Sequence, residues 1–319
     1  MKILVTGAAG FIGFNFCKHL LSIAEPHIVY GLDNINNYYD IGLKKKRLKI
    51  LKKYKNFKFY KIDINNQNKL EKIFKKNKID FVLNLAAQAG VRYSIDHPRK
   101  YIDTNILGFY NILENSTKYK IKRLFYASSS SVYGENNNFP LREDENVNPK
   151  NIYGLSKKVN EEVSQIFNKY YSLKCTGLRF FTVFGEWGRP DMMMMKYINS
   201  HFKKKTFQLN NFGKHIRDFT YVGDVVKILY LLIKNHKKLK SADVLNICSN
   251  KPVKLNKIIK LMKKKNIKPF IKKAPLQKAD ILKTHGSNLK VIKITKFKKF
   301  EKLEVALNKT IDWYIKNYL

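Results

Sequence analysis

Hydrophobic positions in the first 180 residues fall into short apolar runs separated by longer amphipathic stretches. The runs have the length of buried strands, and the stretches between them repeat apolar residues with the spacing of a helix. This alternation predicts a parallel sheet that is covered by helices on both faces. The expected strands lie at residues 2–6, 28–32, 58–62, 81–85, 123–127 and 176–180, and the expected helices at 12–23, 69–76, 99–119 and 153–171.

The pattern loosens after residue 183. Gly and Pro interrupt residues 185–190, short strands and helices follow, and residues 304–318 have the pattern of a closing amphipathic helix. With 319 residues, 44% of them hydrophobic, the chain can bury a large core. We therefore predict an α/β fold: a Rossmann-like doubly wound parallel sheet with a smaller mixed α/β portion that shares one interface with it.

The net charge of +39 raises the question of a polyanionic partner. Only 8 of the 63 basic residues are Arg, the residue that suits bidentate contacts with phosphates and bases. The lysines also occur throughout the chain rather than in one stripe. Lys, Asn, Ile, Phe and Tyr all have A/T-rich codons, so we interpret the charge as a compositional bias that produces a solvated basic surface. We expect no specific nucleic acid partner; a non-catalytic polyanion-binding protein is the remote alternative.

Three cysteines, Cys17, Cys175 and Cys248, are scattered and lack the spacing of metal ligands. We expect core thiols in a reducing cytoplasm, and no metal site. The longest apolar stretches, such as residues 81–87, are too short to span a membrane, and the first strand turns at Gly7, too soon for a signal peptide. We therefore expect a cytoplasmic protein with no membrane partner.

A glycine-rich turn, Gly7-Ala-Ala-Gly10-Phe-Ile-Gly13, follows the first predicted strand. Gly7 permits a tight turn, Gly10 lets the backbone approach a pyrophosphate, and Gly13 lets the next helix pack close to the sheet. Free N–H groups at that helix N-terminus favour an anion. A purely structural turn is the alternative, but Asp33 at the end of the second strand can accept from a ribose 2′-hydroxyl and repel a 2′-phosphate. Together these features predict bound NAD rather than NADP.

Two further motifs supply groups for proton transfer. Tyr153 and Lys157 are four residues apart and share one helix face. A nearby ammonium, or a positive nicotinamide ring, lowers the pKa of a phenol so that it can act as a base. Ser128 to Ser131 follow a strand end, where a hydroxyl can hydrogen-bond a reacting substrate oxygen. A surface Tyr–Lys pair and a flexible serine loop are the alternatives. With a nucleotide cofactor, these groups indicate hydride transfer at a carbinol carbon.

With these motifs the sequence resembles the extended short-chain dehydrogenase/reductase family, in particular its NAD-dependent nucleotide-sugar 4-epimerases, and among those most closely the UDP-glucuronate 4-epimerases. The resemblance extends from residue 3 to about residue 282. The segments that carry it are LVTGAAGFIG (4–13), GLDNIN (31–36), LAAQAGVRYS (85–94), ASSSSVYG (127–134), GLRFFT (177–182), WGRPDM (187–192) and RDFTY (217–221).

The resemblance implies roles for individual residues. Tyr153 matches the catalytic base, Lys157 the residue that lowers its pKa, and Ser129 the Ser/Thr that assists proton movement. Arg189 matches an Arg that pairs with a hexuronate carboxylate, a role suited to its planar fork. The positions that match the NAD site are Gly7, Gly10, Phe11, Ile12, Gly13, Asp33, Asn34, Asp63, Ile64, Leu85, Ala86, Ala87, Gln88, Asn105, Tyr153, Lys157 and Phe180. Those that match the UDP-sugar site are Arg92, Ser129, Ser130, Ser131, Thr182, Arg189, Arg217 and Asp280.

The resemblance also implies a division of the chain and an assembly. Residues 1–183, joined by about 219–249, are expected to bind NAD, and residues 184–218 and 250–319 to bind the UDP-sugar. In similar epimerases the helices near 99–119 and 153–171 form a four-helix bundle with a two-fold mate, so we expect a homodimer, with a monomer as the alternative. The apolar residues expected on these helices include Ile106, Phe109, Ile112, Leu113, Val159, Val163 and Ile166.

Ser130 and Ser131 also narrow the reaction. Related 4,6-dehydratases carry Asp-Glu after the catalytic residue, and related decarboxylases of UDP-glucuronate keep a Glu before Val-Tyr-Gly. Neither serine is an acid, so the resemblance implies C4 epimerisation of UDP-glucuronate to UDP-galacturonate through a 4-keto intermediate, a step suited to polysaccharide biosynthesis. The alternative is a 4-epimerase of another UDP-sugar: UDP-galactose, a UDP-N-acetylhexosamine or a UDP-pentose.

Overall fold

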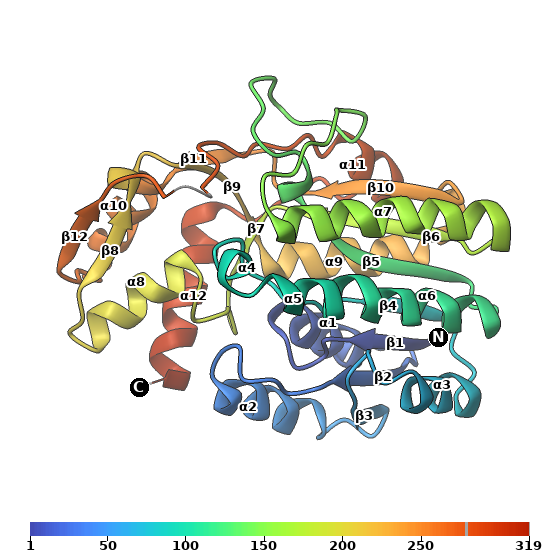
Figure 1. Cartoon of the computed structure of the whole chain (residues 1–319). Helices are drawn as coiled ribbons and strands as arrows, with labels where there is room; N and C mark the ends of the chain where they lie inside the picture. The colour runs from blue at the N-terminus through green and yellow to red at the C-terminus, as the bar shows by residue number, and fades with distance from the viewer. Residues whose placement is uncertain (278–279, 319) are drawn as a thin grey trace.

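Seven parallel strands form the central sheet of the molecule (Figure 1). The computed structural model describes residues 1–277 and 280–318. The strand order is β10-β6-β5-β4-β1-β2-β3, so the chain begins near the middle of the sheet and builds outward to both edges. The strands are β1 Lys2–Thr6, β2 Ile28–Asp33, β3 Phe57–Lys61, β4 Phe81–Asn84, β5 Arg123–Ser129, β6 Cys175–Phe180 and β10 Ala242–Ile247.

Helices cover both faces of this sheet, because successive residues of a strand point to opposite sides. In β1, Ile3 and Val5 belong to the apolar cluster on one face, whereas Leu4 belongs to the cluster on the other. Strands that are apolar at nearly every position are typical of a sheet buried on both faces. The first face carries α1 Phe11–Ser22, α2 Ile41–Leu51 and α9 Val222–Lys234, and the second α3 Gln67–Lys76, α6 Gly108–Lys118 and α7 Ile152–Tyr171.

The structure confirms the α/β prediction and changes some of its elements. Strand β10 extends the sheet beyond β6, and α2 follows β2; neither was predicted. The helix expected at residues 99–119 is divided into α5 Pro98–Tyr101, a π-helical segment Ile102–Leu107, and α6. A π turn holds one residue more than an α turn and is frequent at functional sites. Here it carries Asn105, whose side chain bonds both backbone polar groups of Gln88.

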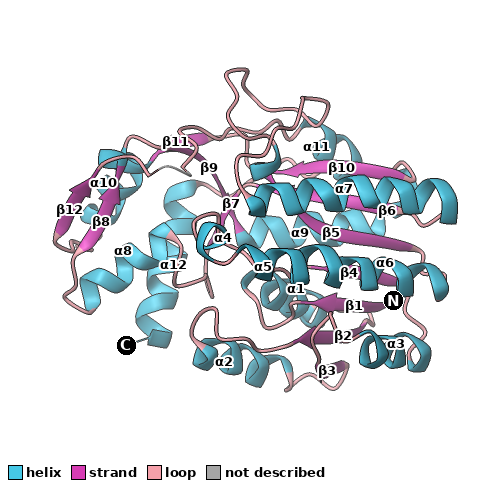
Figure 2. Cartoon of the chain, viewed as in Figure 1, coloured by secondary structure: helices cyan, strands magenta, loops and turns pink. Residues whose placement is uncertain are grey.

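The remaining elements gather mainly beside the carboxyl ends of the central strands (Figure 2). A three-stranded sheet, β11-β9-β7, and a two-stranded sheet, β12-β8, are held there by helices. The predicted C-terminal helix is present as α12 and places Trp313 against Trp187, with ring centroids 5.0 Å apart. The elements are α4 Tyr93–Asp96, β7 Thr182–Phe184, α8 Met193–Phe202, β8 Phe207–Asn210, β9 Ile216–Tyr221, β11 Pro252–Lys254, α10 Leu255–Lys264, β12 Ile271–Ala274, α11 Leu289–Thr295 and α12 Leu303–Tyr318.

The three cysteines are buried and free, as expected of core thiols. None of the helices in the described parts of the chain has both the length and the apolar character that a membrane crossing requires.

Candidate active site

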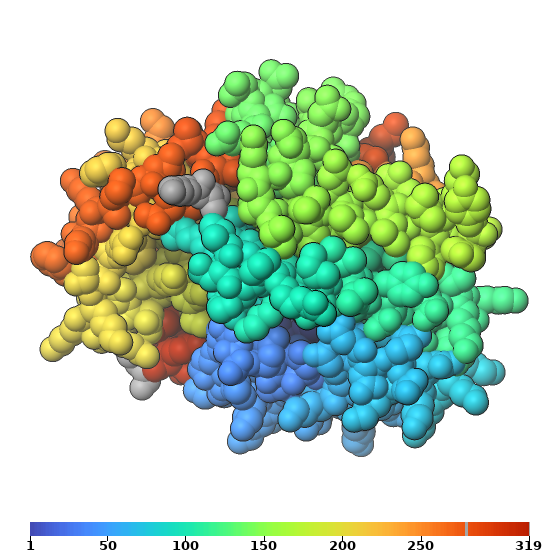
Figure 3. Space-filling view, in the orientation of Figure 1, coloured from blue at the N-terminus to red at the C-terminus, as the bar shows by residue number. Residues whose placement is uncertain are grey.

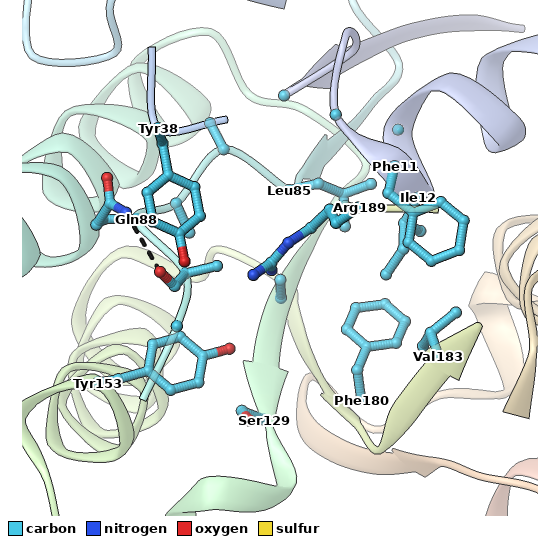
Figure 4. Close-up of a pocket in the computed structure, with 18 of the residues that line it drawn as sticks. Phe11, Ile12, Tyr38, Leu85, Gln88, Ser129, Tyr153, Phe180, Val183 and Arg189 are labelled. Atoms are coloured by element: carbon cyan, nitrogen blue, oxygen red, sulfur yellow. Dashed lines mark hydrogen bonds between the residues drawn. The ribbon is translucent and has the colours of Figure 1, made fainter. Parts of the chain in front are cut away.

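A cavity of about 440 Å³ opens at the carboxyl ends of the central strands, between the large sheet and the smaller portion (Figure 4). Ligands of open parallel sheets bind at this edge. The structure brings most of the predicted residues together here. Those that line the cavity are Gly7, Gly10, Phe11, Ile12, Gly13, Asp33, Asn34, Asp63, Ile64, Leu85, Ala86, Ala87, Gln88, Ser129, Ser130, Ser131, Tyr153, Lys157, Phe180, Thr182, Arg189, Arg217 and Asp280.

The glycine-rich turn closes tightly around the start of α1. Gly7 has a φ of +68°, which favours glycine, and a side chain on Gly13 would lie 2.2 Å from the Gly7 carbonyl oxygen. Helix α1 begins after Gly10 without a side-chain cap. Its first N–H groups, at the edge of the cavity, therefore have no capping side chain as an acceptor. A cradle of this kind accepts a pyrophosphate, because backbone donors and the helix dipole both favour an anion. The turn therefore fits the diphosphate of a dinucleotide.

Asp33 ends β2 beside this turn and is almost fully buried. Its carboxylate accepts hydrogen bonds from the Ala9 N–H at 3.1 Å and the Ile35 N–H at 2.8 Å. Burial raises the pKa of Asp33, and these N–H groups act against that rise. The side chain lines the cavity where the ribose of a dinucleotide would reach a helix-bound diphosphate.

Lys44 is a cavity residue that the sequence analysis missed. It is buried on α2, its Nζ donates to the Asn36 carbonyl at 2.8 Å, and its charge acts on Asp33. Nothing in the sequence near Asp33 marks Lys44, because α2 was not predicted and only its packing carries the lysine inward. Arg47, on the same helix, instead donates to the carbonyls of Ala9 and Trp187 and ties the turn to the smaller portion.

The catalytic candidates meet at the centre of the cavity (Figure 4). Tyr153 and Lys157 lie on α7, which begins after Asn151; the Asn151 side chain accepts from the Gly154 N–H at 2.9 Å and caps the helix. A side chain on Gly154 would lie 2.7 Å from the Ser131 carbonyl oxygen, so this glycine lets α7 approach the serines. Ser129 ends β5, and its Oγ accepts from the Ser131 N–H at 3.1 Å.

Tyr153 lies in a buried environment with two polar neighbours. Burial raises the pKa of Tyr153, and hydrogen bonding with Ser129 and the charge of Arg189 act in the opposite direction. Burial also lowers the pKa of Lys157 to about 8. The Lys157 ammonium lies 6.0 Å from the Tyr153 ring centroid. That Lys157 lowers the pKa of Tyr153 stays a prediction, and Ser129 and Arg189 act in the same direction.

Arg189 extends toward the middle of the cavity, between Leu85 and Tyr153 in Figure 4. One edge of its guanidinium is already paired with Asp191: Nε donates to Oδ1 at 3.0 Å, and Nη2 donates to Oδ2. Asp191 raises the pKa of Arg189 against the effect of burial, so the side chain stays charged. Its Nη1 donates to no described residue and remains for a ligand. The sequence analysis did not foresee Asp191 as a partner.

Arg92 and Asn105 do not line the cavity. The Arg92 Nη2 donates to Asp280 Oδ2 at 2.7 Å, which links the segment after β4 to the smaller portion. Against burial, the neighbouring His215, whose Nε2 lies 3.3 Å from Oδ2, and the hydrogen-bonded Arg92 lower the pKa of Asp280 to about 2. Asn105 is buried behind Gln88 and holds it in place. Other lining residues absent from the predicted set include Tyr38, Tyr39, Thr104, Met192 and Thr284.

A buried ion pair lies behind the serines and was also missed. Glu161 on α7 accepts from both Nε and Nη2 of Arg179 on β6, at 2.9 and 2.7 Å, and from the Ser128 hydroxyl on β5. Arg179 also donates to the Tyr133 hydroxyl at 2.9 Å. Glu161 is four residues beyond Lys157, on the same face of α7. The pair therefore joins the three elements that carry Tyr153, Ser129 and Phe180.

Comparison with known proteins agrees with this arrangement. Residues 3–248 match the NAD dependent epimerase/dehydratase family. The chain belongs to that family. Protein CapI of Staphylococcus aureus is 41% identical over 100% of this chain and 99% of its own length. A UDP-glucuronate 4-epimerase of Thermodesulfobacterium geofontis is 37% identical over 98% and 96%.

A solved structure of the same family has the same architecture. The UDP-glucuronic acid 4-epimerase of Bacillus cereus, in complex with UDP-glucuronic acid and NAD, is 29% identical. It superposes with a TM-score of 0.92 over 99% of both chains. Family membership, the glycine turn and buried Asp33 together make this chain an NAD-dependent member of the family.

Proposed function

We propose that this epimerase inverts C4 of a UDP-hexuronate and interconverts UDP-glucuronate and UDP-galacturonate. One observation carries the proposal: Tyr153, Ser129 and the free edge of Arg189 face the same space, beside Ser130 and Ser131. The carboxylates among the described lining residues are Asp33, Asp63 and Asp280. None of them belongs to the serine segment, where dehydration or decarboxylation would need an acid, so epimerisation is the reaction that this site supports best.

The residues of the chain divide the chemistry between them. The glycine turn and Asp33 would hold NAD, which would supply the hydride acceptor and donor that inversion at C4 requires. Tyr153 Oη takes the proton from the substrate O4 and later gives it back, a role that suits a phenol facing the cavity. The Ser129 hydroxyl, next to Tyr153, hydrogen-bonds O4 and orients it. Lys157, buried beneath Tyr153, supplies positive charge when the phenol ionises.

The diphosphate and sugar ends are assigned to other residues. Arg217 lines the cavity beside Asp280 and is proposed to hold the UDP diphosphate, with Asp280 accepting from the uridine ribose. The substrate carboxylate is proposed to lie against Arg189 Nη1 and the hydroxyls of Ser130 and Ser131. Bidentate or multidentate contacts of this kind fix the orientation of a carboxylate.

The direct test is incubation of the purified protein with UDP-glucuronate, UDP-galactose and UDP-N-acetylglucosamine in separate reactions. Proton NMR of the sugar ring follows inversion at C4. We expect rapid formation of UDP-galacturonate and slower or no conversion of the neutral sugars. If only the neutral UDP-sugars are converted, the assignment of a substrate carboxylate to Arg189 is wrong. If none of the three is converted, 4-epimerisation is wrong.

A 4-epimerase of a neutral UDP-hexose is the second candidate, and one contact favours it. Asp191 already neutralises much of the Arg189 charge, so the space beside it is less positive than an unpaired arginine would make it. A sugar with an uncharged C6 hydroxyl can also accept a hydrogen bond from Nη1. The three-substrate assay separates the two candidates.

The wider organisation is also proposed. Residues 1–183 with about 219–249 form the NAD-binding part, and residues 184–218 with 250–319 complete the UDP-sugar site. We propose a cytoplasmic homodimer in a pathway of polysaccharide synthesis. Free, buried thiols at all three cysteines support a reducing compartment. Exposed apolar residues on α6 and α7, among them Tyr110 and Ile166, support the dimer.

A further inference from the structure

Acidic residues are missing from one lobe of the molecule. We call residues 192–217 and 250–277, which include α8, β8, α10 and β12, the basic lobe. It holds five lysines in its first segment and ten in its second, and no Asp or Glu, although the chain has 24 acidic residues. All of these lysines are exposed, and none forms an ion pair with a described residue. Some lysines elsewhere do have acidic partners, as in Lys118–Glu71, Lys122–Asp80 and Lys234–Glu25.

The free charge is concentrated at one end of the basic lobe, which we call the tip. The chain leaves α8 through Lys203, Lys204 and Lys205 and enters β8, while it leaves α10 and enters β12 alongside. The two connections are joined because the Phe207 N–H donates to the Phe270 carbonyl at 2.8 Å and β8 pairs with β12. Eight exposed lysines therefore gather at the tip: Lys203, Lys204, Lys205, Lys263, Lys264, Lys265, Lys268 and Lys272.

Phe270 stands among these lysines with 76% of its surface exposed, the largest exposed fraction among the described large apolar residues. Figure 3 shows the basic lobe as the yellow and orange-red mass at the left of the molecule. None of its lysines lines the reaction cavity. The tip is therefore free of any role in the proposed catalysis, and an exposed aromatic ring within a lysine cluster calls for a separate explanation.

We propose that the tip docks on the surface of an anionic lipid bilayer. Lysines near an anionic membrane each strengthen binding by about fivefold, and they need no defined stereochemistry to do so. A phenylalanine amid such charges can insert at the boundary between headgroups and acyl chains. Compositional bias explains why lysines are numerous, and residues 41–62 also lack Asp and Glu. Among the described residues, the tip differs from that stretch because its lysines surround a highly exposed phenylalanine. The expectation of no membrane partner followed from the absence of a spanning segment, which a peripheral contact does not require.

A polynucleotide fits the tip less well. Base and phosphate recognition favours the planar fork of arginine, and the one arginine of the basic lobe, Arg217, lines the reaction cavity instead. Binding of single strands without sequence preference uses a groove with several stacking aromatics. The tip presents Phe270 alone, so the bilayer is the partner that its chemistry favours.

The test measures sedimentation of the full-length protein with vesicles of phosphatidylcholine alone and of phosphatidylcholine with one third phosphatidylglycerol. The tip variant replaces Lys203, Lys204 and Lys205 by Gln. Its matched control replaces Lys72, Lys75 and Lys76 by Gln, three exposed lysines on α3 at the opposite end of the molecule (Figure 1). Both variants lower the net charge by the same amount. Thermal unfolding and C4 inversion in solution show whether each variant is folded.

We expect binding to the anionic vesicles at low salt and little to the neutral ones. The tip variant should bind about a hundredfold more weakly, and the control should lose severalfold at most. Phe270→Ser should weaken the binding that survives at high salt. The proposal is overturned if the two lysine variants lose vesicle binding equally, or if the protein does not bind anionic vesicles. It is also overturned if single-stranded RNA binds more tightly than the vesicles and through the same lysines.

Discussion

At the scale of single residues, the chemistry rests on side chains whose surroundings the fold defines. Tyr153 faces the cavity beside Ser129, and Arg189 shares its charge with Asp191. Asp33 is buried against two backbone N–H groups. Tyr153, Arg189 and Asp33 each support one prediction.

Tyr153→Phe should lower turnover by about a hundredfold or more, the range found when a positioned acid–base group is removed. The ring and its packing are kept, so NAD should remain bound. Steady-state kinetics with UDP-glucuronate and mass spectrometry of the released nucleotide measure the two quantities. Turnover close to that of the unaltered enzyme would show that another group is the base.

Arg189→Ala should cost about 2–5 kcal/mol in transition-state binding of UDP-glucuronate, the scale for truncating one partner of a buried hydrogen-bonded charge pair. UDP-galactose should be affected much less. Asp191→Asn is the companion variant: it frees the second edge of Arg189 and should favour the hexuronate further. The measured quantity is kcat/KM for both sugars. Equal losses on both sugars in the alanine variant would argue against a carboxylate-reading role.

Asp33→Asn should weaken NAD binding and ease the entry of NADP. The amide oxygen can still accept one backbone hydrogen bond, but the charge that repels a 2′-phosphate is lost, and Lys44 stays nearby as a positive partner for it. Calorimetric titration of the nucleotide-free protein with each cofactor gives both affinities. Unaltered discrimination between them would mean that Asp33 does not select the cofactor.

At the scale of elements, the buried pair Arg179–Glu161 fixes how α7, β5 and β6 meet. Each partner is almost fully buried, and the Ser128 hydroxyl joins the pair. The geometry of Tyr153 relative to Ser129 depends on α7 keeping its position along β5. The loss of one partner would leave the other charged and buried without compensation.

Glu161→Gln should therefore lower the free energy of unfolding by about 3–5 kcal/mol. It should also lower kcat more than it raises KM, because the catalytic side chains lose their alignment. The matched control is Glu162→Gln, the next residue along α7, whose exposed pair with Lys158 is worth about 0–1 kcal/mol. Urea unfolding and kinetics compare the two. Adding Arg179→Met to Glu161→Gln should restore the free energy of unfolding but not kcat. If Glu161→Gln and Glu162→Gln lose similar amounts of stability and of kcat, the alignment role is wrong.

At the scale of the whole molecule, α6 and α7 lie side by side on one face of the sheet (Figure 1). Several apolar side chains of this region remain exposed. The sheet covers part of the apolar surface expected on these helices and leaves Ile166 exposed. Phe109, Ile112 and Leu113 are buried against the sheet, since they occupy the inward face of α6. The exposed apolar residues are Ile102 and Leu107 on the π-helical segment, Tyr110 on α6, and Leu155, Ile166, Tyr170 and Tyr171 on α7.

We predict that this surface forms the contact with a second copy of the chain. Leu107→Glu with Ile166→Glu should convert the dimer into a monomer, because the like charges would face each other across a two-fold axis. Leu289→Glu on α11, at a residue even more exposed but away from this surface, should leave the assembly unchanged. Light scattering at micromolar concentration gives the masses. A monomer mass for the unaltered protein rejects the dimer.

Much of this protein follows from local sequence patterns. The strand runs, the glycine turn and the spacing of Tyr153 to Lys157 are set by residues close together in the chain, because helix and strand periods and turn geometry are local properties. They placed the parallel sheet correctly and predicted the glycine turn, Asp33, the serines and the Tyr153–Lys157 pair of the cavity. The rest of the predicted lining came from the resemblance to the epimerase family. The C-terminal helix and the buried thiols followed from the same kind of pattern.

Only the tertiary structure decided which distant groups meet. Lys44 reaches Asp33 because α2 packs against the first face of the sheet, and Glu161 meets Arg179 because α7 lies across β6. Which faces of α6 and α7 stay exposed, and where lysines gather without acidic partners, depend in the same way on how whole elements pack. Packing joins residues that are far apart in the chain, so no local period contains that information.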